Sequence, residues 1–406
     1  MQGLETKYLK RKKTPFYFYD IDLLRNTLSV AKTEAAKYGY SVHYALKANA
    51  NERILSEVHN YGFGADCVSG NEVLSALTAG FHPSTIVLAG VGKSDEEIKI
   101  ALDNEIFCFN SESLEELQVI NEIALSMGKT ARIALRINPN VDAHTHHYIT
   151  TGINISKFGI VESDLPEVIA ELKRLPALKF VGLHVHVGSQ VTNLDVFKQL
   201  CDVLNHIQAT YFSENGFTPS FINVGGGLGV NYEDPFSNPI PPLAEYFEIF
   251  HQNLVLKPGQ DVHFELGRSL VANCGVLISK VLYTKKSADK HFMILDAGMT
   301  ELIRPALYQA FHKIQNISRT ADPLEQNYDV VGPICESSDC FGTDINLPLS
   351  HRGDLVAIHS AGAYGEVMSS QYNLRTKVKS YYSDTMGEKM HTLSHAKVMD
   401  FRNTRA

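Results

Sequence analysis

Eight short apolar runs, each followed by a segment of helical periodicity, restrict the possible folds of this chain more than any other feature. The runs are rich in β-branched residues and occupy residues 41–48, 64–69, 86–90, 106–111, 131–139, 180–189, 221–227 and 261–269. Segments with apolar residues at helical spacing lie between them, such as residues 71–79 and 113–127. Strands that alternate with helices predict a parallel sheet, and eight repeats predict an α/β fold with a closed (β/α)8 barrel of the TIM type.

The remainder of the chain has a different pattern. After about Cys274, apolar runs at residues 276–283, 291–296, 328–331, 354–359 and 377–381 follow one another without long helices. This pattern predicts a mostly antiparallel β-barrel or β-sandwich domain. A chain of 406 residues has room for a barrel of roughly 250 residues and a second domain of this kind. We therefore expect the barrel to span residues 22–270 and the β domain to include residues 271–406.

Composition and charge argue against several classes of function. The formal net charge is -8 and no basic run is longer than residues 10–13, so a nucleic-acid surface is not expected. No apolar stretch approaches the roughly 18 residues of a membrane span, and the N-terminus lacks the apolar core of a signal peptide. A cytoplasmic protein without membrane association is expected.

The six cysteines have no repeating spacing, which favours free thiols over a disulfide framework. Cys335 and Cys340 enclose four residues, as half of a zinc site would. No second pair accompanies them, so no metal site is predicted.

The barrel prediction also indicates where the chemistry lies, because active sites of this fold occupy the carboxyl ends of the strands. Lys47 ends an apolar run that begins near Val42. Burial lowers the pKa of a lysine, which favours a neutral amine that can form a Schiff base. The alternative is a strand-end lysine whose ammonium group reaches solvent. Other polar or glycine residues at or just beyond strand ends are Asp66, His186, Ser189, Gly225, Gly226, Gly227, Glu265 and Arg268.

Six motifs in a fixed order carry a resemblance to a known family. They are residues 44–49 (YALKAN), 184–190 (HVHVGSQ), 225–229 (GGGLG), 265–268 (ELGR), 335–339 (CESSD) and 362–365 (GAYG). They resemble the fold-type III pyridoxal phosphate decarboxylases and, among these, the diaminopimelate decarboxylases. The resemblance covers nearly the whole chain. It implies an enzyme that uses pyridoxal 5'-phosphate to convert meso-2,6-diaminopimelate to L-lysine and CO2, and it implies that residues 1–21 join the β domain.

By this resemblance Lys47 is the lysine that forms the Schiff base with the cofactor, and Asp66 is a carboxylate beside it. From the residues alone, an aspartate that begins a helix is an equally good interpretation of Asp66. His186 is assigned to the face of the pyridine ring. His184 points the same way by the two-residue period of a strand, so spacing alone does not choose between them. The remaining cofactor contacts are assigned to Ser189, Gly225, Gly226, Gly227, Gly267, Arg268 and Tyr364.

Glu265 is assigned to the pyridine nitrogen, where a carboxylate keeps the nitrogen protonated and the ring an electron sink. Alanine racemase, which has the same class of barrel, offers an arginine at that point. A glutamate therefore favours decarboxylation over racemisation. Leu266 stands where proline is usual in the family, which affects the rigidity of this loop and not its chemistry.

The segment 302–308 (LIRPALY) resembles the part of diaminopimelate decarboxylases in which an arginine and a tyrosine hold the distal carboxylate of the substrate. Glu336 is assigned to the distal ammonium group, and Cys335 is assigned as the proton donor after decarboxylation. Without the family, the alternatives are an interdomain salt bridge for Arg304 and a small buried hydrophobic position for Cys335. The expected substrate-binding residues are Arg268, Arg304, Tyr308, Glu336 and Tyr364.

In the family the segment that contains Cys335 and Glu336 reaches the cofactor of the other subunit, which implies a homodimer with shared active sites. The family counterpart of residues 142–147, with three histidines at 144, 146 and 147, is a loop near the site entrance and not a metal site.

Two other functions stay open at this point. One is a decarboxylase of broader diamine-forming or D-amino-acid specificity, against which Arg304 and Tyr308 argue. The other is an inactive homologue that binds a partner protein, against which the presence of Lys47, Glu265 and Cys335 argues.

Overall fold

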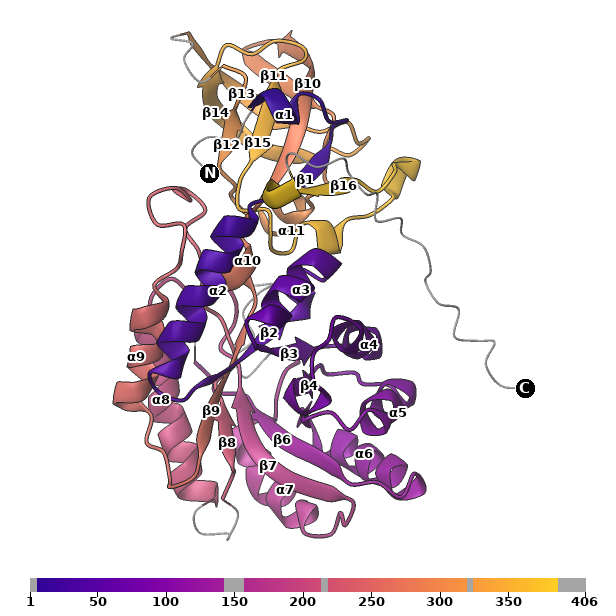
Figure 1. Ribbon diagram of the computed structural model, residues 1–406, viewed down its shortest axis with the longest axis vertical. Coiled ribbons are helices and arrows are strands. Elements are labelled where there is room, and N and C mark those ends of the chain that lie inside the picture. Colours follow the sequence, from indigo (N-terminus) through magenta and orange to yellow (C-terminus); the bar gives the residue numbers. More distant parts are fainter. Residues whose placement is uncertain (1–5, 142–156, 213–217, 320–323, 386–406) are drawn as a thin grey trace, which may run out of the picture.

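The computed structural model describes residues 6–141, 157–212, 218–319 and 324–385, and the larger part of it is a closed barrel (Figure 1). Strand β9 pairs in parallel with β2 and closes the barrel. The predicted (β/α)8 barrel is confirmed. All strands except β5 end before the predicted run does, because the run continues into the loops. The strands are β2 (Ser41–Ala45), β3 (Gly64–Cys67), β4 (Ile86–Leu88), β5 (Cys108–Ser111), β6 (Ala131–Ile137), β7 (Leu178–Val185), β8 (Phe221–Asn223) and β9 (Asp261–Leu266).

Helices surround the barrel (Figure 1), and α4 and α6 are the predicted helices at residues 71–79 and 113–127. Helix α4 is capped by Ser69, whose side chain accepts the N–H of Glu72, and Asp66 lies inside β3. Asp66 is therefore not the start of a helix. Among the described helices, none combines the length and apolar character of a membrane span. The surrounding helices are α2 (Ile21–Ala36), α3 (Glu52–Asn60), α4 (Gly70–Thr78), α5 (Asp95–Asp103), α6 (Leu114–Ser126), α7 (Leu165–Leu172), α8 (Asp195–Ile207) and α9 (Leu243–Asn253).

Stacked rings pack the barrel toward its amino-terminal end. The centroid of the His263 ring lies 4.6 Å from that of Phe221 and 5.4 Å from that of Phe107. Nε2 of His43 lies 2.9 Å from Nδ1 of His263. Burial lowers the pKa of both histidines, that of His263 to about 3, so the pair is neutral at pH 7. This end of the barrel is thus occupied by packing, which leaves the chemistry to the other end.

A second sheet follows the order β12-β15-β10-β11-β13-β14, with β1 paired to both β10 and β16. Its pairs are antiparallel except β11 with β13 and β1 with β16, so the predicted mostly antiparallel sheet is confirmed. Strands β12 and β14 were not predicted, since β12 is short and β14 carries glycine, threonine, aspartate and asparagine. The domain boundaries stay a prediction. The strands are β1 (Phe16–Tyr19), β10 (Gly275–Ser287), β11 (Lys290–Leu295), β12 (Ile314–Asn316), β13 (Glu325–Val331), β14 (Cys340–Pro348), β15 (Leu355–Ile358) and β16 (Lys379–Tyr382).

The β domain contacts the turn that follows β2. The N–H of Tyr364 donates to the carbonyl oxygen of Ala48 at 2.8 Å. Nδ2 of Asn49 donates to the carbonyl oxygen of Gly362 at 2.8 Å and to the hydroxyl of Tyr19 at 3.0 Å. These bonds hold the carboxyl end of the barrel against the second sheet.

Candidate active site

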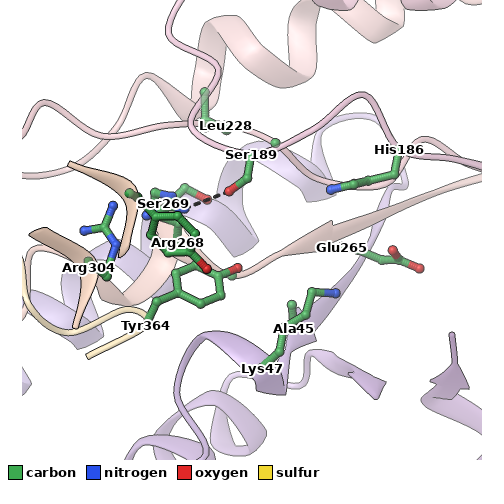
Figure 2. Close-up of a pocket in the computed structure, with 13 residues that line it drawn as sticks. Ala45, Lys47, His186, Ser189, Leu228, Glu265, Arg268, Ser269, Arg304 and Tyr364 are labelled. Carbon is green, nitrogen blue, oxygen red and sulfur yellow. Dashed lines mark hydrogen bonds between the residues drawn. The ribbon is translucent and has the colours of Figure 1, made fainter. Parts of the chain in front are cut away.

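A cavity lies between the carboxyl ends of the barrel strands and the β domain (Figure 2). Barrel loops supply most of its lining, and the β domain supplies α11 (Arg304–Tyr308) and the turn at Tyr364. Most of the predicted site residues meet here. Those that do not line the cavity are Asp66, Gly225, Gly226, Cys335 and Glu336. The lining residues are Ala45, Lys47, His186, Ser189, Gly227, Leu228, Glu265, Gly267, Arg268, Ser269, Arg304, Tyr308 and Tyr364.

Lys47 lies in a short 3-10 helix, η1 (Leu46–Ala48), directly after β2. Its Nζ donates to Oδ2 of Asp66 on the neighbouring strand β3, at 2.6 Å. Burial alone would lower the pKa of Lys47, but the charges of Asp66 and Glu265 and the hydrogen bond raise it above its ordinary value. The predicted lowering of this pKa is therefore wrong. Two carboxylates that are distant in the sequence outweigh the local burial, and Lys47 is an ammonium ion.

Asp66 is fully buried beside this ammonium group. Burial and the charge of Glu265 raise the pKa of Asp66 to about 7, although Lys47 opposes the shift. Its Oδ1 is buried and has no hydrogen-bond partner among the described residues. Asp66 therefore titrates near neutral pH and is placed to exchange a proton with Lys47.

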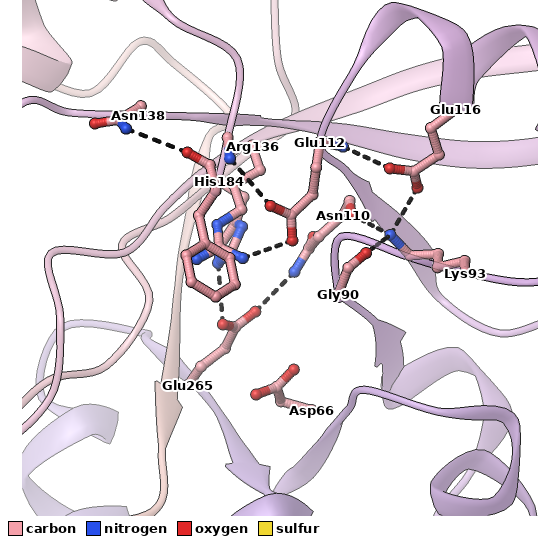
Figure 3. Close-up of polar contacts among 12 residues, drawn as sticks. Asp66, Gly90, Lys93, Asn110, Glu112, Glu116, Arg136, Asn138, His184 and Glu265 are labelled. Carbon is pink, nitrogen blue, oxygen red and sulfur yellow. Dashed lines mark hydrogen bonds and ion pairs between the residues drawn. The ribbon is translucent and has the colours of Figure 1, made fainter. Parts of the chain in front are cut away.

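Glu265, in β9, is held by side chains from three other strands, of which Figure 3 shows Asn110 and His184. Nδ2 of Asn110 and Nδ2 of Asn223 each donate to its Oε1 at 2.8 Å. Nε2 of His184 donates to its Oε2 at 3.0 Å. Burial alone would raise the pKa of Glu265, but His184 and Lys47 lower it below its ordinary value. Glu265 therefore stays ionised inside the barrel.

Buried ion pairs lie beyond Asn110 (Figure 3). Nζ of Lys93 donates to the carbonyl oxygen of Asn110 at 2.8 Å and to Oε1 of Glu116 at 2.6 Å. Nη1 of Arg136 donates to Oε1 of Glu112 at 2.6 Å. Each of these cations has a carboxylate partner, so the layer is balanced in charge and fixes Asn110.

The structure places His184 and His186, between which spacing could not choose, in different surroundings. His184, in β7, binds Glu265, whereas His186 lies just beyond the strand and lines the cavity. Nδ1 of His186 accepts the N–H of Gly226 at 3.1 Å, so its proton is on Nε2. Burial and the charge of Arg136 lower the pKa of His186 well below its ordinary value. The stacking of His186 on a cofactor ring stays a prediction.

Close packing explains two of the three glycines after β8. A Cβ on Gly226 would lie 2.0 Å from the carbonyl oxygen of Glu265. Gly225 has φ +70 and a Cβ there would lie 2.4 Å from the carbonyl oxygen of Val185. The N–H groups of both glycines already donate to side chains of the protein. At these two positions, glycine is thus required by contact with the protein itself, whereas the predicted reason was room for a phosphate. Of the three glycines, Gly227 alone lines the cavity.

Arg268 begins α10 (Arg268–Val271) and is held by neutral oxygens. Its Nη1 donates to the hydroxyl of Tyr232 at 2.7 Å. Its Nη2 donates to Oγ of Ser189 at 2.8 Å (Figure 2). Within the described residues no carboxylate lies at ion-pair distance from Arg268, and its Nε and the Oγ of Ser269 are buried without a hydrogen-bond partner. A buried cation beside unused donors is typical of a site for an anion such as phosphate.

Arg304 is the second buried cation of the cavity, with 4% of its surface exposed. Its Nη1 donates to Nε2 of His312 at 2.7 Å, and its guanidinium carbon lies 4.6 Å from the centroid of the Tyr232 ring. Burial lowers its pKa, but a guanidinium group stays charged in proteins. In the described part of the chain, no carboxylate pairs with Arg304. The interdomain salt bridge that was the alternative role of Arg304 is therefore not found among these residues.

Cys335 and Glu336 lie outside the cavity of their own chain. Cys335 is exposed, so the alternative interpretation of this residue as a small buried hydrophobic side chain is wrong. Glu336 accepts a hydrogen bond from the hydroxyl of Tyr372 at 2.6 Å. All six cysteines are free. The segment with His144, His146 and His147 lies outside the described residues.

Sequence reasoning missed Asn110, Asn223, Tyr232, Ser269 and His312. Asn223 ends β8, Asn110 is the last residue but one of β5, and Ser269 adjoins Arg268. The rule that active sites lie at strand ends could therefore have found these three. Tyr232 and His312 lie in loops and carry no such signal.

The family model described as the pyridoxal binding domain of pyridoxal-dependent decarboxylases matches residues 23–272. A diaminopimelate decarboxylase of Bacteroides thetaiotaomicron is 52% identical over 375 residues, which cover 92% of this chain and 96% of that protein. The diaminopimelate decarboxylase of Helicobacter pylori J99 is 45% identical and covers 90% of this chain and 89% of its own. The chain belongs to the diaminopimelate decarboxylase family.

Solved structures agree with this assignment. The crystal structure of diaminopimelate decarboxylase from Helicobacter pylori, complexed with L-lysine, has a TM-score of 0.87 and 41% identity, with 93% of each chain covered. The arginine decarboxylase of Paramecium bursaria Chlorella virus has a TM-score of 0.82 at 19% identity, which shows the shared fold alone.

The chain is thus a carboxy-lyase whose cofactor is pyridoxal 5'-phosphate, and the residues of the cavity fit that cofactor. Lys47 offers an amine for the aldehyde, and Glu265 offers an ionised carboxylate for the ring nitrogen. Ser189, Arg268 and Ser269 offer donors for the phosphate, of which Arg268 Nε and Ser269 Oγ have no partner among the described residues.

Proposed function

We propose that this enzyme removes CO2 from the D-centre of meso-2,6-diaminopimelate and releases L-lysine. The observation that carries the proposal is Arg304, a buried cation with no carboxylate partner in the described chain, on the other side of the cavity from Lys47 (Figure 2). A substrate whose amine reacts at Lys47 therefore needs an anion at its far end. Diaminopimelate has a second carboxylate there, and ornithine does not. L-Lysine, bound in the solved Helicobacter pylori relative, keeps that carboxylate.

The side chains divide the work of the reaction. When bound, pyridoxal 5'-phosphate withdraws electrons from the carbon that loses CO2. Lys47 carries a proton that must leave before its amine reacts, and Oδ2 of Asp66, 2.6 Å away, is placed to take it. Glu265 presents an ionised carboxylate that keeps a proton on the ring nitrogen. Tyr308 and Tyr364 line the same cavity, and we assign them to contact with the substrate.

We also propose a homodimer in which Cys335 and Glu336 complete the active site of the partner subunit. Both residues are exposed in their own chain and neither lines its cavity. Apolar surface adjoins them, since Leu374 is 97% exposed and Tyr372, which binds Glu336, is 48% exposed. The six free cysteines support a cytoplasmic location.

A substrate panel tests the proposed reaction. The purified enzyme is loaded with pyridoxal 5'-phosphate and offered meso-diaminopimelate, LL-diaminopimelate, L-lysine and L-ornithine, with detection of CO2 and of the amine product. We expect CO2 and L-lysine from meso-diaminopimelate at a much higher kcat/KM than any product from the other three. Equal or faster release of CO2 from lysine or ornithine would replace this proposal with a decarboxylase of broader specificity.

A further inference from the structure

The contact between Arg304 and His312 has a defined direction. Nδ1 of His312 lies 2.8 Å from the carbonyl oxygen of His359, which can only accept a hydrogen bond. Nδ1 of His312 therefore carries the proton. In a neutral His312, Nε2 then carries no proton. Its lone pair accepts the hydrogen bond from Nη1 of Arg304 at 2.7 Å.

His312 holds Arg304 without changing the charge of the cavity. His312 is 1% exposed. Burial and the nearby charges of Arg304 and Arg268 lower its pKa to about 3, so His312 is neutral at pH 7. A carboxylate at this position would orient Arg304 equally well but would form an ion pair with it, and a ligand would have to compete with that pair.

Tyr232 completes the arrangement. Its ring lies against the guanidinium group of Arg304, at 4.6 Å, and meets the His312 ring edge to face, with centroids 5.0 Å apart. Its hydroxyl accepts a hydrogen bond from Arg268 at 2.7 Å. Tyr232 thus touches both buried arginines and adds no charge to either.

We propose that His312 and Tyr232 are specificity-determining positioning residues, which orient Arg304 through uncharged contacts and so keep its whole positive charge for the distal carboxylate of the ligand. The inference rests on the proposed function, because it takes Arg304 as the receptor for that carboxylate. It assigns the selectivity of the site to the lack of charge at position 312 as well as to Arg304.

Two ligands that differ by one carboxylate test this inference. L-Lysine and pentane-1,5-diamine carry the same two amines, and only L-lysine has the carboxylate. Their dissociation constants are measured by titration calorimetry on the holoenzyme and on His312→Gln and His312→Glu. These two variants match in size, both offer an oxygen to Arg304, and they differ in charge. Cofactor absorbance and thermal unfolding show whether each variant is folded and loaded.

We expect the wild type to bind L-lysine more tightly than the diamine, and His312→Gln to keep most of this preference. His312→Glu should reduce the preference by at least about tenfold, through weaker binding of L-lysine alone. Equal preferences in the two variants would overturn the inference. If His312→Glu does not fold, His312→Met replaces it in the comparison. Methionine provides no strong acceptor, so a preference equal to that of His312→Gln would again overturn the inference.

The proposed function has a separate readout in the same experiment. If the wild type does not prefer L-lysine, or if Arg304→Ala keeps the preference, Arg304 is not the carboxylate receptor and the proposed function loses its support. If Arg304→Ala loses the preference while His312→Glu keeps it, the proposed function stands and only the role of His312 is wrong.

Discussion

Replacing Glu265 with glutamine removes the charge that we propose for the cofactor ring and preserves nearly the same shape. In the structure Oε1 accepts two amide hydrogens at 2.8 Å and Oε2 accepts from His184 at 3.0 Å. Glutamine keeps the contacts of Oε1. Its amide nitrogen would face His184, whose Nδ1 is unpaired in the described chain and can take the ring proton instead. We therefore expect a loss of stability of about 1 to 2 kcal/mol, the size of one altered hydrogen bond.

The effect on the reaction is expected to be larger than the effect on folding. In its proposed role the carboxylate would hold a proton on the ring nitrogen of bound pyridoxal 5'-phosphate, and a neutral amide would not replace it. Loss of one such preorganised electrostatic contact costs on the order of 100-fold or more in kcat. Cofactor occupancy should stay near that of the wild type, because Arg268 and Ser189, which we propose as phosphate donors, are unchanged.

The assay compares kcat per bound cofactor, cofactor content from absorbance and the free energy of unfolding. Glu57→Gln is the matched control, since Glu57 is 5% exposed, lies in α3 outside the cavity lining and pairs with Arg25 and Arg53. It should lower stability without slowing turnover per bound cofactor. If Glu265→Gln instead loses cofactor while turnover per bound cofactor is unchanged, Glu265 only binds the cofactor and the reasoning is refuted.

Three further predictions follow from the site and the barrel. Lys47→Ala should abolish steady-state turnover while circular dichroism stays unchanged, and substantial turnover would remove Lys47 from its assigned role. Mixing inactive Lys47→Ala chains with inactive Glu336→Ala chains should restore up to about a quarter of wild-type activity, because random dimers then include one intact site in four; no recovery, with chain exchange demonstrated, would place Glu336 in the site of its own chain. The free energy of unfolding should fall as pH decreases below about 6.5. Unfolded histidines bind a proton below that pH, whereas His263 and His312 in the folded protein have pKa values of about 3 and stay neutral. Each histidine contributes up to about 1.4 kcal/mol per pH unit to this fall. Between pH 7 and pH 5, denaturation should show a smaller loss of unfolding free energy for His312→Gln than for the wild type. An equal loss would contradict the neutral state of His312.

The barrel and the position of its site could be predicted because both depend on periodicity along the chain. Each strand is a run of apolar residues, and the fold places all carboxyl ends together. The ends themselves were predicted too late, as at β2 and β8, because apolar and glycine residues continue into the loops that build the site. Strand β14 was missed since its polar residues become a strand only by pairing with β13.

The electrostatics of the site could not be predicted from local patterns. The environment of Lys47 in the sequence indicates burial alone, which lowers the pKa of an amine. The sign of the shift is decided by Asp66 on β3 and Glu265 on β9, which the closed barrel brings to the same place. His312 follows Arg304 by eight residues, and no spacing rule connects a loop histidine to the orientation of an arginine.

In the proposed reaction, the separation of charge within the cavity determines which carboxylate leaves. Arg268 and Arg304 lie on one side of the close-up and Lys47 and Glu265 on the other (Figure 2). A carboxylate paired with an arginine is stabilised in the ground state, and that pairing is lost as the group becomes neutral CO2, so an arginine beside the departing group would raise the barrier. At the other end of the cavity, Lys47 faces the carboxylates of Asp66 and Glu265. Arg268 and Arg304 are the arginines of the described cavity lining, so this end offers no further guanidinium to the carboxylate next to the reacting amine. The proposed chemistry therefore requires that the arginines be held away from Lys47 and remain charged, and neutral partners such as Ser189, Tyr232 and His312 meet both conditions.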